Sequence, residues 1–170
     1  ELPENLYYHG VHHTIDVCSA ATMLALSENI DKENMELIKV AALFHDTGFI
    51  RQYDENENIS CEIAREFLPA FDFSSAETEI ICGMIMATKI PQTPKNQIEE
   101  ILADADLDYL GRADYYSTAK TLFSELNANK KFLDENKWRQ IQIKFLGNHK
   151  YFTRTAIELR EPEKQKQLEK

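Results

Sequence analysis

The sequence predicts an all-α fold, an irregular bundle of about seven or eight helices in a single domain. Apolar residues recur at helical spacing along almost the whole chain, and no segment alternates in the way a half-buried strand does. The chain has 170 residues, a length that suits one domain, and its hydrophobic fraction of 43% allows a buried core. With only 5 glycines and no internal repeat, the sequence indicates one helical domain over residues 1–170.

The first four predicted helices each carry a stripe of apolar residues at spacings of three and four. Such residues share one face of a helix and are expected to pack into the core. The stripes are Val17, Ala21 and Leu24 in a helix from about Val11; Ile38, Ala41, Ala42 and His45 after Asp31; Ile59, Ile63 and Phe67 before Pro69; and Ile80, Ile81, Met84 and Ile85 after the candidate caps Ser74 and Ser75.

The second half of the chain has the same pattern, after Pro91 and Pro94 interrupt it. Its stripes are Ile98, Ile101, Leu102 and Ala105; Leu122, Phe123 and Leu126; and Trp138, Ile141 and Phe145. A last helix starts near Tyr151 and runs into the charged segment 161–170, which we expect to be frayed. The aromatic residues expected in the core of this half are Trp138, Phe145 and Phe152.

The net charge of −10 restricts the partners of the protein. A surface that binds polymeric nucleic acid needs a basic patch, so the acidic balance excludes that class of function. A small phosphorylated substrate is still compatible with the charge, because a bound divalent metal ion reverses the sign of the local field. Most of the excess negative charge is expected on the solvated surface.

The cysteines and the absence of long apolar segments indicate the compartment. Cys18, Cys61 and Cys82 are odd in number, widely spaced and set among apolar residues, as expected for reduced core cysteines of a cytoplasmic protein. No stretch approaches the roughly 18 apolar residues of a membrane span, so no membrane association is expected. The first residue is Glu1 rather than Met, which suggests a domain excised from a larger protein. The sequence leaves open whether the chain forms a homodimer.

Three histidines stand on otherwise apolar helical faces. His9 and His13 are four residues apart, so they would project from the same side if the first helix includes both. His13 also precedes Val17 by four, which places it on the buried stripe. His45 belongs to the stripe of the second predicted helix, which Gly48 terminates, and it points inward as well.

Aspartates supply the other half of a candidate site. Asp46 directly follows His45, and Asp104, Asp106 and Asp108 are spaced by two in the fifth predicted helix. Asp106 is the best placed of these three to face the core, because leucines stand four positions before and after it. Each feature has an ordinary interpretation too: a core histidine is usually hydrogen-bonded, a His-Asp dipeptide is common, and spaced aspartates often form a solvated face.

The coincidence of two imidazoles and two carboxylates favours a divalent metal site. Buried carboxylates are costly and normally persist by pairing or by binding a metal. A mixed set of two histidines and two aspartates suits Mn, Mg, Fe, Co, Ni or Zn and leaves positions open for water and substrate.

The order of these residues resembles the HD-domain superfamily of metal-dependent phosphohydrolases. The likeness runs essentially end to end and includes the stretches YYHGVHHTIDV, AALFHDTGFI, ATKIPQTP, EEILADADLDYLGRADYY and FLGNHKYFTRTA. It implies that His13, His45, Asp46 and a late aspartate ligate the metal, and that a metal-activated water attacks a phosphoester. Asp106 is preferred as the late ligand, because its neighbours are similar to the cyclic nucleotide phosphodiesterase pattern, and Asp104 is the alternative.

The same resemblance assigns proton transfer. The tyrosine–histidine pair that ends at His9, four residues before His13, is similar to the phosphodiesterase pattern in which that histidine protonates the leaving oxygen. His9 is therefore the candidate general acid, with Asp46 or the late aspartate assisting the nucleophile.

One departure from the family pattern concerns the number of metal ions. HD proteins with two metals usually carry extra histidines between the HD pair and the late aspartate. Asn56 and Thr88 stand where those histidines would fall, and no histidine occurs between His45 and His149. One metal ion per chain is therefore expected, and a second ion would depend mostly on water and carboxylates. Dioxygen-using chemistry is disfavoured for the same reason.

Phosphate recognition needs cations or backbone donors near the metal. The candidates for substrate binding are Arg51, Lys89, Arg112 and His149, with Lys150 and Arg154 as further alternatives. An ordinary solvent-facing charge is the simpler interpretation of each, although Lys89 and His149 lie in segments that match the family. Tyr109 is equally suited to contact a base or phosphate and to pack in the core.

The leading hypothesis is hydrolysis of a phosphomonoester or phosphodiester of a small molecule such as a nucleotide. A metal-stabilised regulatory or ligand-binding module of a signalling protein is the main alternative, since the missing second-site histidines suit it equally well. A helical scaffold whose polar residues satisfy one another is the third hypothesis. The pairing of a candidate general acid with a full ligand set favours the enzyme.

Overall fold

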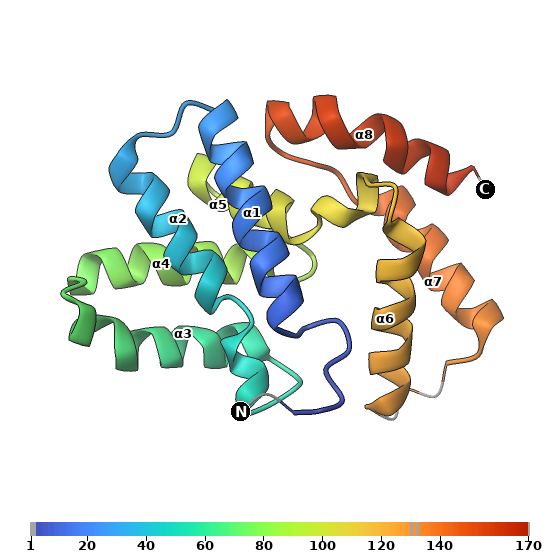
Figure 1. The fold of residues 1–170 in the computed structure, drawn as a ribbon, viewed down its shortest axis with the longest axis horizontal. Coiled ribbons are helices and arrows are strands. Elements are labelled where there is room, and N and C mark those ends of the chain that lie inside the picture. The colour runs from blue at the N-terminus through green and yellow to red at the C-terminus, as the bar shows by residue number, and fades with distance from the viewer. Residues whose placement is uncertain (1–2, 130, 132, 170) are drawn as a thin grey trace.

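The computed structural model describes residues 3–129, 131 and 133–169, and within these ranges it contains helices and no strand. Figure 1 shows their arrangement. The elements in chain order are α1 Val11–Ser27, α2 Lys32–Phe44, the 3-10 helix η1 Thr47–Ile50, α3 Asn56–Phe67, η2 Leu68–Phe71, α4 Ser75–Thr88, α5 Gln97–Asp106, η3 Asp108–Gly111, α6 Tyr115–Ala128, α7 Glu135–Asn148 and α8 Arg154–Leu168. The predicted all-α class is confirmed. None of the described helices has the length and apolar character required to cross a bilayer.

Several helices begin where a side chain can accept one of their first N–H groups. The Asp31 carboxylate accepts from the Asn34 N–H at 2.9 Å, and Ser74 and Glu77 form a reciprocal capping box at the start of α4. Ser74 is therefore the cap of α4, and Ser75 is its first residue. The side chains of Asn96, Asp134 and Thr153 cap α5, α7 and α8 in the same way.

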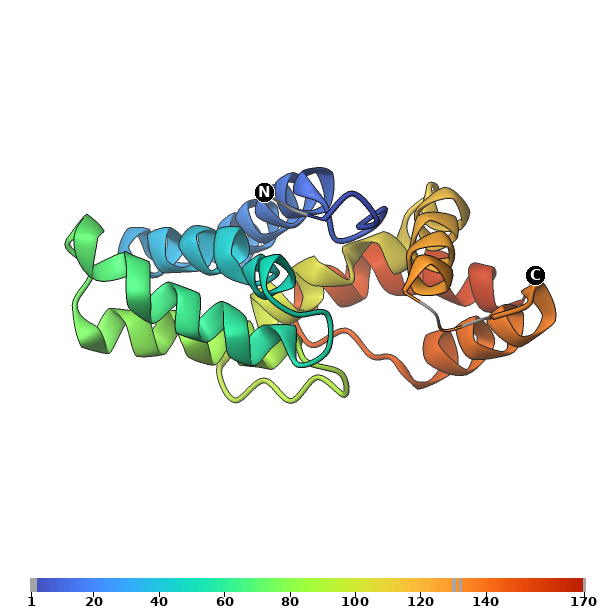
Figure 2. The same cartoon turned by 90° about the horizontal axis from the view of Figure 1, so that it is seen from below.

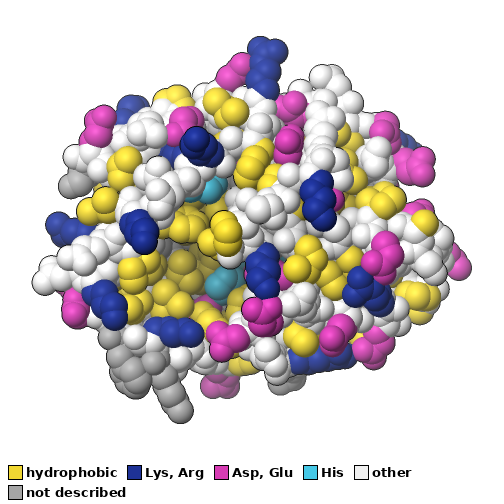
Figure 3. Space-filling view, turned by 180° about the vertical axis from the view of Figure 1, so that it is seen from behind, with side chains coloured by type: hydrophobic (Ala, Val, Ile, Leu, Met, Phe, Trp, Pro, Cys, Tyr) yellow, Lys and Arg dark blue, Asp and Glu magenta, His cyan; other side chains and the backbone are white. Residues whose placement is uncertain are grey.

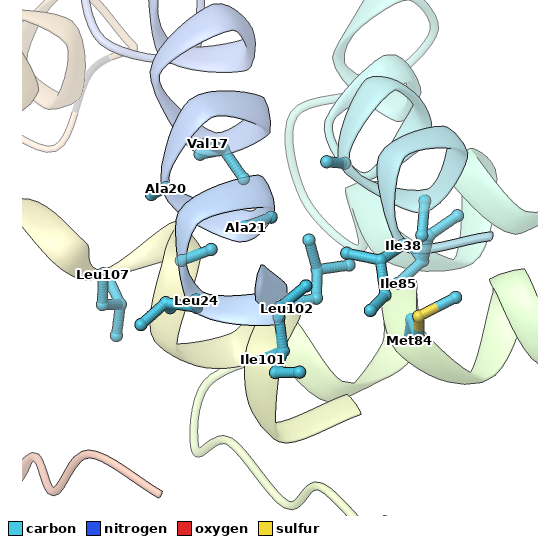
Figure 4. Packing of buried hydrophobic residues seen from close by; sticks show 14 of the residues in the cluster. Val17, Ala20, Ala21, Leu24, Ile38, Met84, Ile85, Ile101, Leu102 and Leu107 are labelled. Atoms are coloured by element: carbon cyan, nitrogen blue, oxygen red, sulfur yellow. The ribbon is translucent and has the colours of Figure 1, made fainter. Parts of the chain in front are cut away.

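The core is formed where α1, α2, α4 and α5 pack together (Figure 4). Leu24, Ile38, Ile85 and Leu102 have no exposed side-chain surface, as their helical spacing predicts. Burying each such side chain contributes roughly 1.5–3 kcal/mol to folding. The prediction was wrong for part of the outer stripes, because Phe67, Ile80 and Ile141 are 48%, 41% and 40% exposed.

Helix α5 has neighbours on several sides, and this determines where its polar residues point. It packs against α1, α2 and α4, and η3 continues it toward α8. Residues 101–105 are all buried, so α5 has no solvent-facing side near its carboxyl end. Any aspartate in this segment must therefore find a partner inside the protein.

Helices α6 and α7 lie at the opposite end of the molecule from the η2 turn (Figures 1 and 2). Among the described residues, α6 packs mainly on η3 and α7 mainly on α8. The pair therefore forms a side wall beside the α1–α5 body, and a cleft runs between the two parts.

The charged tail differs from its prediction. We expected residues 161–170 to be frayed, but α8 continues to Leu168, and residue 170 lies outside the described part. The Lys164 side chain is only 1% exposed, donates to the His149 carbonyl at 2.6 Å and pairs with Glu161 at 2.8 Å. The buried aliphatic stem and these polar contacts hold the last turns of α8 in place.

Candidate metal centre and adjoining cleft

Three side chains from three helices converge in the interior. His13 comes from α1, His45 from the end of α2 and Asp106 from the last turn of α5. The His13 Nε2 lies 3.0 Å from Asp106 Oδ1 and 3.4 Å from His45 Nε2. One ligand atom from each of the three residues lies within 4.8 Å of the others, as expected for groups that share one ion.

Asp46 is the fourth side chain of this cluster and supplies its second carboxylate oxygen. Its Oδ2 lies 3.1 Å from His45 Nε2 and 3.5 Å from His13 Nε2, yet this buried atom has no hydrogen-bond partner among the described residues. Its Oδ1 accepts a bond from the Asn56 amide at 3.3 Å. A buried carboxylate oxygen without a hydrogen-bond partner costs free energy unless a cation occupies the space it faces.

The backbone around His45 orients its ring toward the cluster. The Nδ1 lies 2.8 Å from the Ala42 carbonyl, which can only accept, so Nδ1 carries the hydrogen, and a metal ion bound at Nε2 would take the place of the second proton. Ser60 donates to the His45 carbonyl at 2.7 Å and accepts from the Gly48 N–H at 2.8 Å. These bonds fix the imidazole in an orientation in which Nε2 could bind a metal ion.

Gly48 has a different role from the one predicted. We expected it to end the second helix as a left-handed cap, but its φ is not positive, and it belongs to η1. A Cβ at this position would lie 1.9 Å from the Asn56 carbonyl oxygen. Glycine is therefore required at this position, because the backbone at the start of α3 lies too close to leave room for a side chain.

The charges in the cluster depend on one another. Burial disfavours a charged His45, but Asp46 and Asp106 outweigh burial and raise the pKa of this imidazole well above its usual value. Burial likewise opposes ionisation of Asp106, but His13 and His45 lower the pKa of its carboxyl. Both carboxylates are therefore ionised at neutral pH, and two nitrogens with two oxygens fit a divalent transition metal ion.

The carboxylate of Glu125 holds His9 at the edge of the cluster, a role that we did not predict. Glu125 comes from α6, is fully buried, and its Oε1 lies 2.5 Å from His9 Nδ1. Its Oε2 accepts the backbone N–H groups of Tyr8 and His9, and Tyr53 donates to Oε1 at 3.0 Å. The one signal in the sequence was a glutamate three residues after Leu122 on an otherwise apolar stripe.

The contact with Glu125 determines the protonation of His9. Burial lowers the pKa of the imidazole, whereas Asp46 and Glu125 raise it, and the net result is a pKa above the usual value. A protonated His9 donates from Nδ1 to Glu125, and its Nε2–H stays available as an acid. Because His9 and Asp46 line the same cavity, this proton can reach a molecule bound there.

Asp104 lies outside the metal cluster. Its carboxylate accepts the backbone N–H groups of Phe152 and Thr153 at 2.9 and 2.8 Å, and the Thr153 hydroxyl at 2.7 Å. Its side chain thus attaches the start of α8 to α5. Of the two aspartates that the sequence left as alternatives, Asp106 faces the histidines and Asp104 does not.

The structure brings none of the four predicted phosphate-binding residues to the cavity of the cluster. Arg51 pairs with Glu66 at 2.7 Å and Lys89 with Glu55 at 2.5 Å, both near the surface. Arg112 is held by three carboxylates, those of Asp16, Asp108 and Asp114. His149 lies beside Lys164, where burial and that ammonium group lower the pKa of its ring to about 4.

The cluster opens into a cavity of about 260 Å³ between the helical body and the α6–α7 wall. Asn56 and Thr88 line it beside Asp46, and Tyr109 lines it near Asp106. We expected Trp138 and Phe145 in the core, but both are half-buried and line this cavity together with Leu122, Leu126 and Ile141. Among the described lining residues none is Lys or Arg, so the walls are apolar and aromatic around a carboxylate-rich end.

Comparison with known proteins agrees with this architecture. One solved structure, described as a predicted HD superfamily hydrolase from an uncultured Thermotogales bacterium, has a similar fold with a TM-score of 0.62. The two share 21% sequence identity, and the alignment covers 95% of this chain and 76% of the other. No curated protein sequence is similar enough to this chain to count as a match.

The sequence profile of the HD domain matches residues 10–110. This range is more than half of the chain and includes His13, His45, Asp46 and Asp106. The chain therefore belongs to the HD domain family.

Proposed function

We propose that this protein is a metal-dependent phosphohydrolase that cleaves a phosphomonoester or phosphodiester of a small molecule such as a nucleotide. The observation that supports this most directly is the meeting of His13, His45, Asp46 and Asp106 at the end of a cavity that His9 also lines. A proton donor beside a cation site is what hydrolysis of a phosphoester requires. The relative of similar fold is itself described as a predicted hydrolase.

The four-residue cluster holds one divalent ion in this proposal. Such an ion supplies Lewis-acid polarisation of a phosphoryl oxygen and lowers the pKa of water, so that water becomes a nucleophile at neutral pH. Asp46 combines two roles, since one oxygen faces the histidines and the other is oriented by the amide of Asn56. It is placed to accept a proton from the attacking water.

His9 donates the proton that the leaving oxygen needs. Its raised pKa favours the protonated ring, which is the form that a general acid requires. Glu125 is a positioning residue, because it fixes the ring through Nδ1 and stabilises the imidazolium while the opposite nitrogen faces the substrate.

The test combines metal analysis with turnover. Purified protein should bind about one equivalent of Mn, Fe, Co, Ni, Zn or Mg and hydrolyse 4-nitrophenyl phosphate, its bis ester or a nucleotide only when loaded. A His45→Ala variant should lose both the metal and the activity. A loaded protein that hydrolyses none of these substrates would contradict the enzymatic proposal. A variant that retains the metal of the unchanged protein would contradict the assigned site.

A ligand-binding module of a signalling protein is the second candidate, and one observation favours it. The described residues that line the cavity include no Lys or Arg to hold a phosphate. Asn56 and Thr88 also line it, at the positions where the family resemblance would place the histidines of a second metal site. This candidate predicts saturable binding of a phosphorylated small molecule by the metal-loaded protein without hydrolysis. Product analysis of the bound ligand separates the two functions.

A further inference from the structure

A second cavity of about 520 Å³ adjoins the cavity of the metal centre. The two share the side chains of Ile90, Ile141 and Phe145 as a common wall, so a ligand in one lies next to the other. Figure 3 shows a hollow on one face of the molecule, with apolar side chains and histidines inside it and Lys and Arg side chains around its rim. The binding region is therefore larger than the space beside the metal ligands.

The two cavities have opposite charge. Asp46, Asp106 and Glu57 line the first, which has no Lys or Arg among its described lining residues. Lys144 and Lys150 line the second, and no Asp or Glu is among its described lining residues. A ligand that spans the shared wall would thus pass from a carboxylate-rich end, where a metal ion supplies the positive charge, to an end with fixed cations.

The two lysines differ from the other cationic residues considered as phosphate ligands. Arg51, Lys89 and Arg112 each pair with a carboxylate within 3 Å. Neither Lys144 nor Lys150 has an ion pair or hydrogen bond with another described residue, in a chain whose net charge is −10. Two ammonium groups that line one cavity without acidic partners favour an anionic ligand, since binding it requires breaking no existing salt bridge.

The apolar surface between the carboxylate-rich cavity and the two lysines limits which chemical groups of a ligand can lie against it. Ile141 and Phe145 belong to one face of α7, and Phe152 and Pro91 extend the same apolar lining in the second cavity. A flat or apolar group fits against such a surface, whereas a flexible polyphosphate chain would leave it uncovered and gain little from it.

We propose that the second cavity binds the distal part of the substrate, which consists of a planar or apolar body and a second anionic group held by Lys144 and Lys150. The proposal rests on the function above, because it takes the phosphoryl group that is cleaved to lie at the metal centre. It defines the substrate class as small molecules that carry a phosphoryl group, a flat or apolar body and a second anionic group separate from the first. Nucleoside bisphosphates belong to this class, and nucleoside monophosphates do not.

Trp138 allows binding to be measured apart from catalysis. It is the single tryptophan of the chain and lines the first cavity. Its fluorescence is followed after rapid mixing of the metal-loaded protein with adenosine 3′,5′-bisphosphate or with adenosine 5′-monophosphate, so that binding is read before hydrolysis proceeds. The bisphosphate should bind about five- to tenfold more tightly, the size expected for one additional ion-paired group.

The variant Lys144→Gln/Lys150→Gln should reduce this preference to less than about twofold. Lys32→Gln/Lys39→Gln, at one exposed and one partly buried position of α2 that line neither cavity, removes the same charge and should leave the preference unchanged. Equal affinities in the unchanged protein, no saturable quenching by either nucleotide, or a preference that survives loss of both cavity lysines would each overturn the proposal.

Turnover of the same two nucleotides by the metal-loaded protein separates this inference from the proposed function. A lysine-dependent binding preference without any hydrolysis would support the second cavity and contradict the phosphohydrolase. Hydrolysis of both nucleotides without a lysine-dependent preference, in kcat/KM or in binding, would support the proposed phosphohydrolase activity. It would contradict the proposed role of the second cavity in substrate binding.

Discussion

Asp104 and Asp106 stand two residues apart near the end of α5, yet their surroundings have little in common. The Asp104 carboxylate is saturated by N–H and O–H donors from the start of α8. The Asp106 carboxylate faces His13 and His45, whose nitrogens are equally suited to a metal ion. Burial raises the pKa of Asp104 to about 6 despite its hydrogen bonds, whereas the pKa of Asp106 is lowered against the effect of burial. The groups that contact each carboxylate, rather than its burial, therefore distinguish an aspartate that anchors α8 from one that is placed to bind a metal ion.

The largest expected effect comes from removing the charge that faces the histidines. Asp106→Asn should abolish stoichiometric metal binding and lower kcat/KM by about 10³-fold, because several kcal/mol of transition-state stabilisation depend on the ion. Metal content by mass spectrometry and steady-state kinetics measure the two effects. Asp104→Asn is the matched control, since it makes the same chemical change at the same helix end and should leave the metal in place. The reverse pattern, with metal lost only from the Asp104 variant, would exchange the two assignments.

The second largest effect is expected from removing the Asp104 carboxylate, which should lower the stability of the fold without affecting metal binding. Asp104→Ala leaves the Phe152 and Thr153 donors without their acceptor, and we expect the free energy of unfolding to fall by about 2–4 kcal/mol. Urea unfolding of the metal-free protein provides the measurement, so that loss of a ligand cannot account for the change. Unaltered stability would mean that α8 is not anchored through this carboxylate.

Glu125 combines features of both aspartates, because it accepts backbone N–H groups as Asp104 does and contacts a histidine as Asp106 does. Glu125→Gln keeps an acceptor but removes the charge that raises the pKa of His9. A general acid acts only while protonated, so activity is present below the pKa of His9 and falls as the pH rises through it. The variant should shift this alkaline limb to lower pH and reduce kcat by about 10- to 100-fold.

A pH–rate profile of the Glu125 variant decides whether the residue acts through His9 or only supports the fold. A fall in kcat with an unchanged alkaline limb would indicate a purely structural role. The metal content should be unchanged in either case, because Glu125 is not one of the converging ligands.

The helical periodicity of the sequence explains what could be predicted and what could not. It places His13 and His45 on buried stripes, and the structure brings both to the same point. It favours Asp106 through the leucines four positions before and after it, but Asp104 stays an alternative, because α5 is surrounded by other helices and residues 101–105 are all buried. Helical periodicity identifies a buried face only when the opposite face of the helix is exposed to solvent, and this end of α5 has no exposed face.

Contacts between distant segments account for the remaining errors. Glu125 meets His9 across 116 residues, and no local pattern encodes such a distance. The stripe of Trp138 and Phe145 is apolar whether it faces a core or a cavity, so its spacing could not reveal the cleft wall. The family resemblance supplied the metal ligands but gave no information on which cations already have carboxylate partners.

The smallest effect is expected where a predicted role has no structural support. Arg51 is about half exposed and pairs with Glu66 rather than lining either cavity. Arg51→Gln should change the free energy of unfolding by less than about 0.5 kcal/mol and kcat/KM by less than about twofold, as is usual for an exposed ion pair. The same kinetic assay should therefore show a large loss of kcat/KM for Asp106→Asn and almost none for Arg51→Gln. A tenfold rise in KM for Arg51→Gln would instead place a phosphate near η1, and the cavity of the metal centre would then have to extend past Asp46 toward the surface of α3.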